Sequence, residues 1–482
     1  MQFDRQESLG KVEALDLFRT QSVPHMARRN YLIEVRHLLL WGVFAGMFEG
    51  SVSSIVVAKT FNAGPWLITI VMATPMFSNL MGLVWGSVAT SRRKLPLFMT
   101  LAASATVLIG SVAFAPLNEY GGYIFAGQIL LARVMLSGCM TVRSGLWKHN
   151  YPTRLRGRIA ARLQFVRFSL AIATVTFASM MFDVNPRIYV YAYPLAALIG
   201  GVAVFLLRGI HVRGEKMELA NLARNLEQSG PSPGQGFFGP VRAAIDVLRN
   251  DRDYRQYMLA MTLLGFANIM IMPIMTIIVT KQLMLSYYHS CNLLEVIPRL
   301  LMMVSIMPWA GLFDRVGVVR FRIVNACAWT GASLFGGLAA AVIYYADIIQ
   351  SLPAFVFAVC LVAISRLCEG LGKGGGAIAW NIGHLHFARS ADAEIYMGTH
   401  VFLTGLRGLI APFFGTLLYM HYGPLSFVVA TSLALAGVFT FASLAKLQRR
   451  QAIEQEETSE TNLNLTQSAK SEPERATAST TS

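Results

Sequence analysis

The sequence predicts an all-α membrane protein in which twelve transmembrane helices form two pseudo-symmetric six-helix bundles. Composition is the first observation behind this prediction. Hydrophobic residues make up 54% of the 482 residues and charged residues only 14%, whereas soluble domains carry roughly 25% charge. The second is the recurrence of long apolar stretches, and the third is the uneven distribution of basic residues between them. Together they exclude a secreted disulfide-stabilised domain, a disordered protein and a soluble enzyme.

Twelve stretches of mainly apolar residues are each long enough to form a helix across the hydrocarbon, which takes about 20 residues. They cover residues 38–58, 66–88, 96–116, 122–146, 163–182, 188–207, 257–280, 293–312, 323–345, 352–376, 396–420 and 424–445. The third, seventh and ninth lack Asp, Glu, Lys and Arg. The last two form one long uncharged run, which His421, Gly423 and Pro424 divide at a turn.

Lysine and arginine are concentrated in the connections that follow even-numbered spans, such as Arg92 and Arg93 after the second. The connections after odd-numbered spans carry only Lys59, Arg187 and Lys281. The positive-inside rule therefore places both termini and the central loop in the cytoplasm, with the protein in the cell inner membrane. Topology accounts for most of the net charge of +15, so no nucleic-acid partner is expected.

The spans group into two halves separated by a linker. The predicted domains are a cytoplasmic N-terminal arm (1–37), an N-terminal six-helix bundle (38–207), a cytoplasmic linker (208–256), a C-terminal six-helix bundle (257–446) and a disordered cytoplasmic tail (447–482). The linker contains the Gly- and Pro-rich segment 229–240, which favours a flexible connection. The tail is rich in Ser, Thr, Glu and Gln and has no apolar periodicity.

An internal repeat supports the two halves. A shift of 233 residues aligns Arg133 with Arg366 near the middle of the fourth and tenth spans, and places Arg167 on His400. The same shift aligns Trp147 with Trp380 and Arg156 with Arg389. Equivalent spans of the two halves come into register, as expected for parallel repeats in transporters.

The loop between the eighth and ninth spans reads Ala310-Gly-Leu-Phe-Asp-Arg-Val-Gly-Val-Val-Arg320. It resembles the signature loop of the major facilitator superfamily. The residues of this sequence at the motif positions are Gly311, Asp314, Arg315 and Gly317, and the equivalent loop after the second span keeps Gly86, Arg92 and Arg93. That second loop has Thr90 where the family motif has an acid.

Two further segments carry the resemblance, which covers about residues 35–447. Arg133 looks like the arginine of the family's fourth-helix motif, although the usual glutamine is missing. The segments 380–386 and 399–412 are similar to a bacterial subgroup of the superfamily.

The resemblance implies a secondary transporter that works by alternating access, with the two bundles rocking about a site near the middle of the membrane. The loop motifs would form a gate, because an aspartate at a helix end can cap a neighbouring helix and pair with arginine. Thr90 cannot form such an ion pair in the N-terminal half, and the sequence leaves open whether the two gates are equally strong.

Six charged residues fall near the middle of the predicted spans. They are Glu49, Arg133, Arg299, Arg366, Glu369 and Arg407. A charge facing lipid costs about 2.5–3.5 kcal/mol or more, so these side chains must face the interior, a water-filled cavity or one another. The resemblance places all six within reach of a central cavity. They form the predicted substrate and ion pathway.

Each of these charges also has a purely structural interpretation. Arg366 and Glu369 are three residues apart and can form a local ion pair that lets the helix insert. Arg299 can pair in the same way with Glu295, four residues away. Arg407 can bind substrate or pair with Glu369.

Glu49 has no partner on its own helix, so its predicted partner is Arg133 or a proton. A carboxyl that carries a proton inside the membrane suits proton coupling.

The expected function is therefore proton-coupled transport of a small, possibly anionic solute, since the six charges sum to a positive cavity. One alternative is a proton-driven exporter of amphipathic compounds, which predicts an apolar, aromatic-lined cavity. Another is a non-transporting receptor or assembly protein, which would show no flux in proteoliposomes. The expected partners are membrane lipid, a small-molecule substrate and a proton or other coupling ion, and the expected oligomeric state is a monomer.

No enzyme, cofactor or metal site is predicted. The glycine-rich segment 370–376 lacks the Ser or Thr and the preceding strand of a phosphate loop. His384, His386 and His400 are expected in a cytoplasmic loop, without the acids or cysteines that would complete a metal site. The five cysteines lie in apolar runs and are expected to pack there.

Overall fold

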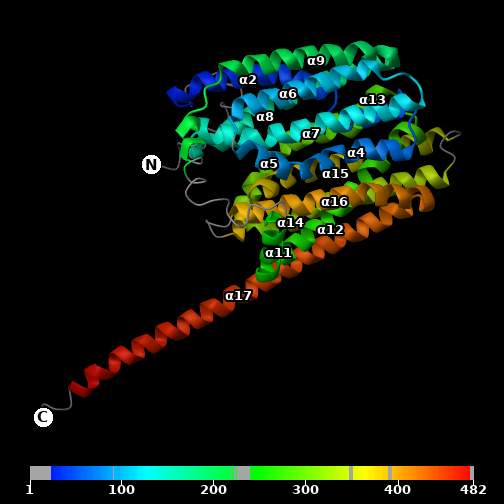
Figure 1. Cartoon of the computed structure of the whole chain (residues 1–482). Coiled ribbons are helices and arrows are strands. Elements are labelled where there is room, and N and C mark those ends of the chain that lie inside the picture. Colours follow the sequence, from blue (N-terminus) through cyan, green and yellow to red (C-terminus); the bar gives the residue numbers. More distant parts are fainter. Residues whose placement is uncertain are drawn as a thin grey trace, which may run out of the picture.

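The computed structural model describes residues 23–90, 92–217, 219–221, 224, 239–346, 351–388 and 393–477. Within these ranges the regular structure is helical, and the helices run side by side (Figure 1). Most of the predicted N-terminal arm and the linker segment 225–238 lie outside the described residues.

The N-terminal half consists of helices α2 to α9. Its elements are α2 (His25–Gly46), α3 (Val52–Lys59), α4 (Pro65–Leu80), α5 (Gly82–Thr90), α6 (Lys94–Gly110), η2 (Ser111–Phe114), α7 (Glu119–Asn150), α8 (Thr153–Val184), η3 (Pro186–Ile188), α9 (Tyr189–Leu206) and η4 (Leu207–Gly209). Side-chain caps start two of them: Asn118 accepts the N–H of Gly121 at α7, and Asn185 accepts that of Arg187 at η3.

The C-terminal half follows helix α11 (Gly239–Asn250), which lies in the predicted linker. Its elements are α12 (Arg252–Ile277), η5 (Ile278–Gln282), α13 (Tyr287–Cys291), η6 (Asn292–Val296), α14 (Ile297–Tyr345), α15 (Leu352–Ile382), η7 (Gly383–His386), α16 (Ala393–Tyr422) and α17 (Leu425–Thr477). Both η5 and η6 are π-helical turns, a geometry that is common at functional sites.

Nine segments of the described chain are helical, long and apolar enough to cross a membrane. One of them, Tyr287–Tyr345, contains both the eighth and the ninth predicted span, and Gly317 (φ 73°, ψ 169°) interrupts the helical geometry between them. The first two predicted spans are not among the nine, because each is a broken helix. The all-α membrane fold is confirmed, and the number twelve stays a prediction.

The sequence predicts continuous helices over 38–58 and 66–88, and this is wrong at two points. The first is broken between Gly46 and Val52, where Gly50 adopts a φ of +64° that ends a helix. The second is broken at Met81, between α4 and α5. Such breaks leave backbone N–H and C=O groups without partners inside the helix. At the first break, these groups form hydrogen bonds with charged side chains.

The tail from residue 447 is predicted to be disordered, but in the structure α17 continues through it as a helix to Thr477. This extension points away from the bundles (Figure 1). Its local sequence offers a physical reason, because Glu, Gln, Ala and Lys favour helix and α17 is already nucleated inside the bundle.

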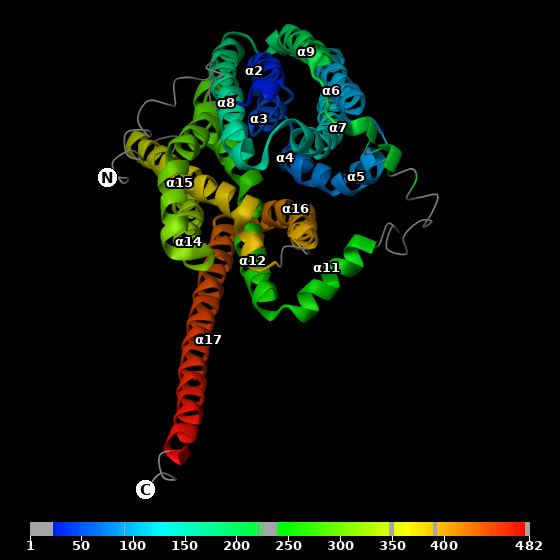
Figure 2. The same cartoon turned by 90° about the vertical axis from the view of Figure 1, so that its left-hand side faces the viewer.

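The two halves form separate groups of helices when viewed along their axes (Figure 2). Within the first, α2 packs on α8 and α9, and α6 packs on α7 and α9. Within the second, α14 packs along α15, and α12 on α16 and α17. The halves meet chiefly where α4 contacts α16 and α12, and where α8 contacts α13.

Gly415 sets the distance between α16 and α12. A Cβ atom on Gly415 would lie 2.1 Å from the carbonyl oxygen of Met270, so the two backbones are in contact there. We expect Gly415→Ala to lower the thermal midpoint of the purified protein, since overpacking costs about 1–3 kcal/mol. Gly398→Ala, in the same helix but with open space around it, is the matched control and should not lower the midpoint, since alanine favours helix more than glycine does. Equal midpoints for the two variants would contradict the close approach.

Candidate functional site

A cavity of about 350 Å³ lies between the halves, within the usual range of small-molecule sites of about 300–1,000 Å³. Helix α4 supplies one wall, and α12, α14, α15 and α16 supply the rest. Its polar and aromatic lining residues are Asn79, Asn268, Trp329, Arg366, Glu369, Lys373, Trp380, Thr404 and Arg407. The cavity therefore combines charge with two indole rings.

Three charged residues of α15 form one cluster in this cavity. Arg366 donates to Oε2 of Glu369, and the Nζ of Lys373 lies 2.8 Å from Oε1 of the same carboxylate. Arg366 and Glu369 are 3% and 6% exposed. Both carboxylate oxygens are thus occupied by cations of their own helix, which is the local pairing that the spacing allows. Lys373 joins this pair instead of only extending toward the membrane surface.

Arg407 is a buried cation of the cavity without a carboxylate partner among the described residues. It is 7% exposed, donates to the carbonyl oxygen of Met261 at 2.7 Å and to Oγ1 of Thr404 at 2.9 Å, and its Nε has no hydrogen-bond partner. The alternative pairing with Glu369 is not formed. A Cβ atom on Gly265 would lie 2.5 Å from the Cζ of Arg407, so this glycine makes room for the guanidinium group.

The other three predicted pathway residues do not line this cavity. Glu49 forms an ion pair with Arg167 of α8, whereas Arg133 donates to the carbonyl oxygen of Phe48 at 2.7 Å. The first of the two predicted partners of Glu49, Arg133, is therefore not its direct ion-pair partner, and the other, a proton, stays a prediction. The break after α2 is the physical reason, because it frees the Phe48 carbonyl for Arg133.

Sequence reasoning missed Arg167 as the partner of Glu49. The sequence does contain an indication of this partner, because Arg167 is a charged residue within the predicted span 163–182. Arg133 and Arg299 nevertheless lie close enough to Glu49 to interact with it electrostatically. We call Glu49, Arg133, Arg167, Glu295 and Arg299 the interface charge cluster.

Glu295 links this cluster across the halves. Its Oε1 accepts from Arg299, as the four-residue spacing predicts, and its Oε2 accepts the backbone N–H of Ser51 at 2.8 Å. Ser51 directly precedes α3, so the carboxylate sits at a helix N-terminus. A Cβ atom on Gly50 would lie 2.0 Å from Oε2 of Glu295, and only glycine leaves space for this contact.

Asp183 makes the reciprocal contact from the N-terminal half. Its two carboxylate oxygens accept the backbone N–H groups of Tyr287 and Tyr288 at 2.6 and 2.9 Å, at the start of α13. Tyr287 also hydrogen-bonds Thr60 at 2.8 Å and stacks on Phe182. Each half thus places a carboxylate on a helix N-terminus of the other. We call these two contacts, through Glu295 and Asp183, the reciprocal latch.

Further hydrogen bonds join the halves at the same end of the molecule. Lys59 donates to the carbonyl oxygen of Leu285 at 2.8 Å, and Lys281 donates to Oδ1 of Asn62 at 2.6 Å. This end, formed by the connections 60–64, 183–187 and 281–286, is closed by polar contacts. We call it the latch end.

The predicted gate motif is exposed. Asp314 and Arg315 lie on the surface, and within the described chain neither of them forms an ion pair. Arg92 and Arg93 are exposed as well. Gly311 and Gly317 have open space around them, and so does Gly86. Without an ion pair at Asp314 or Arg315 in the described part of the chain, the role of the motif as a gate stays a prediction.

The three histidines do not share one loop environment. His384 and His386 lie in η7, but His400 lies inside α16, is 2% exposed and contacts the ring of Trp380 edge-on with centroids 4.2 Å apart. The expectation of a loop position for His400 is wrong, because α16 begins at Ala393. No group of three or more His, Cys, Asp or Glu side chains in the described residues has metal-binding geometry.

Comparison with solved structures identifies the fold. A mutant form of the nucleoside transporter NupG matches with a TM-score of 0.61 at 12% identity, covering 87% of this chain and 99% of that one. The inward-open xylose transporter XylE from E. coli matches at 0.56 and 13% identity, covering 86% and 95%. A POT family transporter bound to a thioalcohol-conjugated peptide matches at 0.55 and 11%, covering 87% and 95%.

A search of family models finds no match, and neither does a search of curated proteins. At these identities the structural neighbours establish the fold. The chain is an all-α membrane protein that shares the fold of these solved transporters.

Proposed function

We propose that the protein is a secondary transporter that moves a small anionic solute by alternating access, coupled to protons. Its fold is shared with transporters of nucleosides, xylose and peptides. The single observation that carries the anionic substrate is Arg407, a buried guanidinium in the cavity without a carboxylate partner among the described residues. With Arg366, Lys373 and Glu369, the cavity has two more positive than negative charges, which attracts anions.

Arg407 is arranged to bind an anion without large rearrangement. Two of its nitrogens are held by Met261 and Thr404, so the guanidinium is oriented before a ligand arrives. Trp329 and Trp380 line the same cavity and can pack on the apolar part of a solute. Asn79, from the other half, can hydrogen-bond the solute and close the site from α4. A ligand spanning these groups would contact both halves, as alternating access requires.

The reciprocal latch and the exposed gate motif support a defined state of the cycle. The connections at the latch end carry few basic residues, which supports an orientation with this end outside the cell. This conformation is then closed to the outside and open toward the cytoplasm. In the opposite state the latch would break and Asp314 and Arg315 would close the cytoplasmic side. Glu49 and the interface charge cluster lie between these two ends and would change partners as the halves rock.

The binding prediction concerns Arg407. We expect a panel of small carboxylates and phosphates to contain compounds that raise the thermal midpoint of the purified protein, by ligand linkage. Arg407→Gln should weaken that binding at least about tenfold, because a charge-assisted hydrogen bond contributes about 1.5–3 kcal/mol. Gly265→Ala should weaken it too, because its methyl group displaces the guanidinium.

Arg187→Gln, which removes an exposed arginine at the latch end, is the matched control and should leave binding unchanged. Suppose instead that only neutral amphipathic compounds stabilise the protein, and that Arg407→Gln does not change this stabilisation. This outcome would contradict the proposal of an anionic substrate and favour an exporter of amphipathic compounds. Flux of the bound anion in proteoliposomes tests transport itself, and a total absence of flux would favour a non-transporting protein.

The conformational prediction concerns Gly50. Gly50→Ala adds a methyl group where Oε2 of Glu295 lies, in a backbone conformation that disfavours side chains. We expect this variant to open the latch end. Spin labels can be attached at Tyr120 and Met284, exposed residues on the two halves near that end, in a background without native cysteines. Pulsed electron paramagnetic resonance should then report a new, longer distance between the two labels. Gly64→Ala, at the same end with open space around it, should keep the original distance, and an unchanged distance in Gly50→Ala would contradict the latch.

A further inference from the structure

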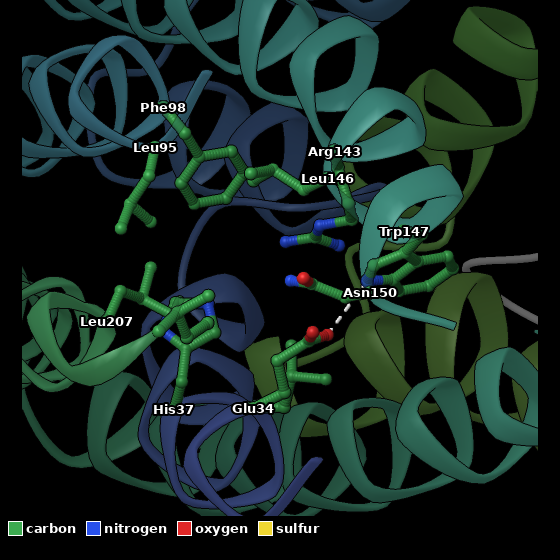
Figure 3. A pocket seen from close by; sticks show the side chains of 11 residues that line it. Glu34, His37, Leu95, Phe98, Arg143, Leu146, Trp147, Asn150 and Leu207 are labelled. Atoms are coloured by element: carbon green, nitrogen blue, oxygen red, sulfur yellow. Dashed lines mark hydrogen bonds between the residues drawn. The ribbon is translucent and has the colours of Figure 1, made fainter. Parts of the chain in front are cut away.

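A second buried polar site lies inside the N-terminal half, away from the central cavity. Its small cavity is lined by α2, α6, α7 and η4 (Figure 3). Glu34 and His37 approach from α2, and Arg143 and Asn150 from α7, while Leu95, Phe98 and Leu207 form an apolar wall. Glu34 and His37 precede the first predicted span, so this site lies toward the end opposite the latch.

Glu34 is held by neutral groups alone. One oxygen of its carboxyl group accepts the indole N–H of Trp147 and the other accepts the O–H of Tyr151, each at 2.8 Å. Glu34 is 7% exposed, and within the described residues no cation lies within ion-pair distance of it. The interface charge cluster is different, because Glu49 there is bound directly by Arg167. A proton on Glu49 would have to displace an arginine, whereas a proton on Glu34 would not.

Within the part of the chain that the structure describes, two side chains at the same cavity have polar atoms without a hydrogen-bond partner. Asn150 is 2% exposed, and neither its amide nitrogen nor its amide oxygen has a hydrogen-bond partner. His37 is 2% exposed as well. Its Nδ1 lies 2.9 Å from the carbonyl oxygen of Ala203 and must carry the hydrogen, because a carbonyl oxygen only accepts. The Nε2 of His37 is then an acceptor, and it has no partner.

The chemistry of these atoms selects the occupant. Asn150 offers one donor group and one acceptor, His37 offers an acceptor, and Arg143 offers donors. A metal cation would be repelled by Arg143, and an anion would leave both acceptors unsatisfied. Water both donates and accepts, and the cavity of about 20 Å³ exceeds the roughly 10–15 Å³ that one water molecule needs.

We propose that this cavity is a hydrated proton-binding site in which one water molecule bridges Asn150, His37 and Arg143 and delivers a proton to Glu34. The inference rests on the proposed proton-coupled transport and names the carboxyl group that takes up the proton. The step balances without a cation in the cavity: the bound water passes one proton to the Glu34 carboxylate, which becomes a neutral acid, and takes one proton in turn from hydronium in the solvent, so that a neutral water remains bound. Protonation weakens the acceptor for Trp147 and Tyr151, and so loosens α2 from the end of α7.

The groups around Glu34 determine whether its pKa is raised or lowered. Burial raises the pKa of Glu34, while the hydrogen bonds from Tyr151 and Trp147 and the charge of Arg143 oppose that rise. From its own helix, His37 lines the same cavity, and Tyr31 interacts electrostatically with Tyr151 and with Arg162 of α8. The side chains that α6 and η4 add to the cavity wall are apolar. The neutral acid therefore forms at a higher pH than for an exposed glutamate, and ionises as the pH rises further.

Infrared difference spectroscopy of the purified full-length protein, titrated with pH and without substrate, tests this site. We expect a carbonyl band of a protonated carboxyl group that is lost in Glu34→Gln. Tyr151→Phe removes a donor to the ionised form and should move the midpoint of this band up by about one pH unit. A shift of this kind is not expected from a purely structural role. Because no substrate is needed, the result is independent of whether Arg407 binds anions.

Glu215→Gln is the matched control. Glu215 is also 7% exposed, but its carboxylate accepts the backbone N–H of Lys94 at 2.5 Å, at the start of α6. This variant should keep the band. A band that survives in Glu34→Gln but disappears in Glu49→Gln would assign the proton to the interface charge cluster and overturn the proposal. The absence of any titrating carboxyl band in the wild-type protein would overturn it as well.

Discussion

The structure depends on one constraint, which is that a charged side chain inside an apolar helix bundle must find a partner of its own. Water cannot solvate it there, and lipid exposure costs several kcal/mol. The chain meets this constraint in two large clusters. The first joins Arg366, Glu369 and Lys373 along one face of α15, and the second is the interface charge cluster around Glu49. Arg407 lies beside the first cluster but outside it, and the absence of a carboxylate partner for it among the described residues indicates what the cavity can bind.

The reciprocal latch shows how the same constraint can produce a conformational switch. Glu295 and Asp183 each use backbone N–H groups at the start of a helix in the opposite half, where the helix dipole favours a negative charge. These contacts require both halves to be in register, so the proposed rocking of the halves would break them together. Glu295 keeps Arg299 when it loses Ser51, because that partner is on its own helix. The charge therefore remains compensated while the contact between the halves is made and broken.

Composition and hydropathy predict the fold well, because the bilayer imposes one requirement on every span. The local pairs Arg366–Glu369 and Glu295–Arg299 also follow from helix spacing. The partner of Glu49 does not, since it depends on a left-handed Gly50 that breaks the first span and directs Arg133 to the Phe48 carbonyl. The site around Glu34 was missed for a related reason. Glu34 and Tyr151 are more than a hundred residues apart in the sequence, and only the folded arrangement of the N-terminal half brings them to hydrogen-bond distance.

The positions of the proposed anion site and proton site have a mechanical consequence. Arg407 belongs to the C-terminal half, while Glu34 lies wholly within the N-terminal half, where its donors Trp147 and Tyr151 also lie. Coupling between them cannot be direct electrostatics across one pocket, and has to act through the relative position of the halves. A ligand on Arg407 that also contacts Asn79 of α4 favours one arrangement of the halves, and protonation of Glu34 changes how firmly α2 is held to α7. Each ligand then influences the other only to the extent that it binds the two states with different affinity.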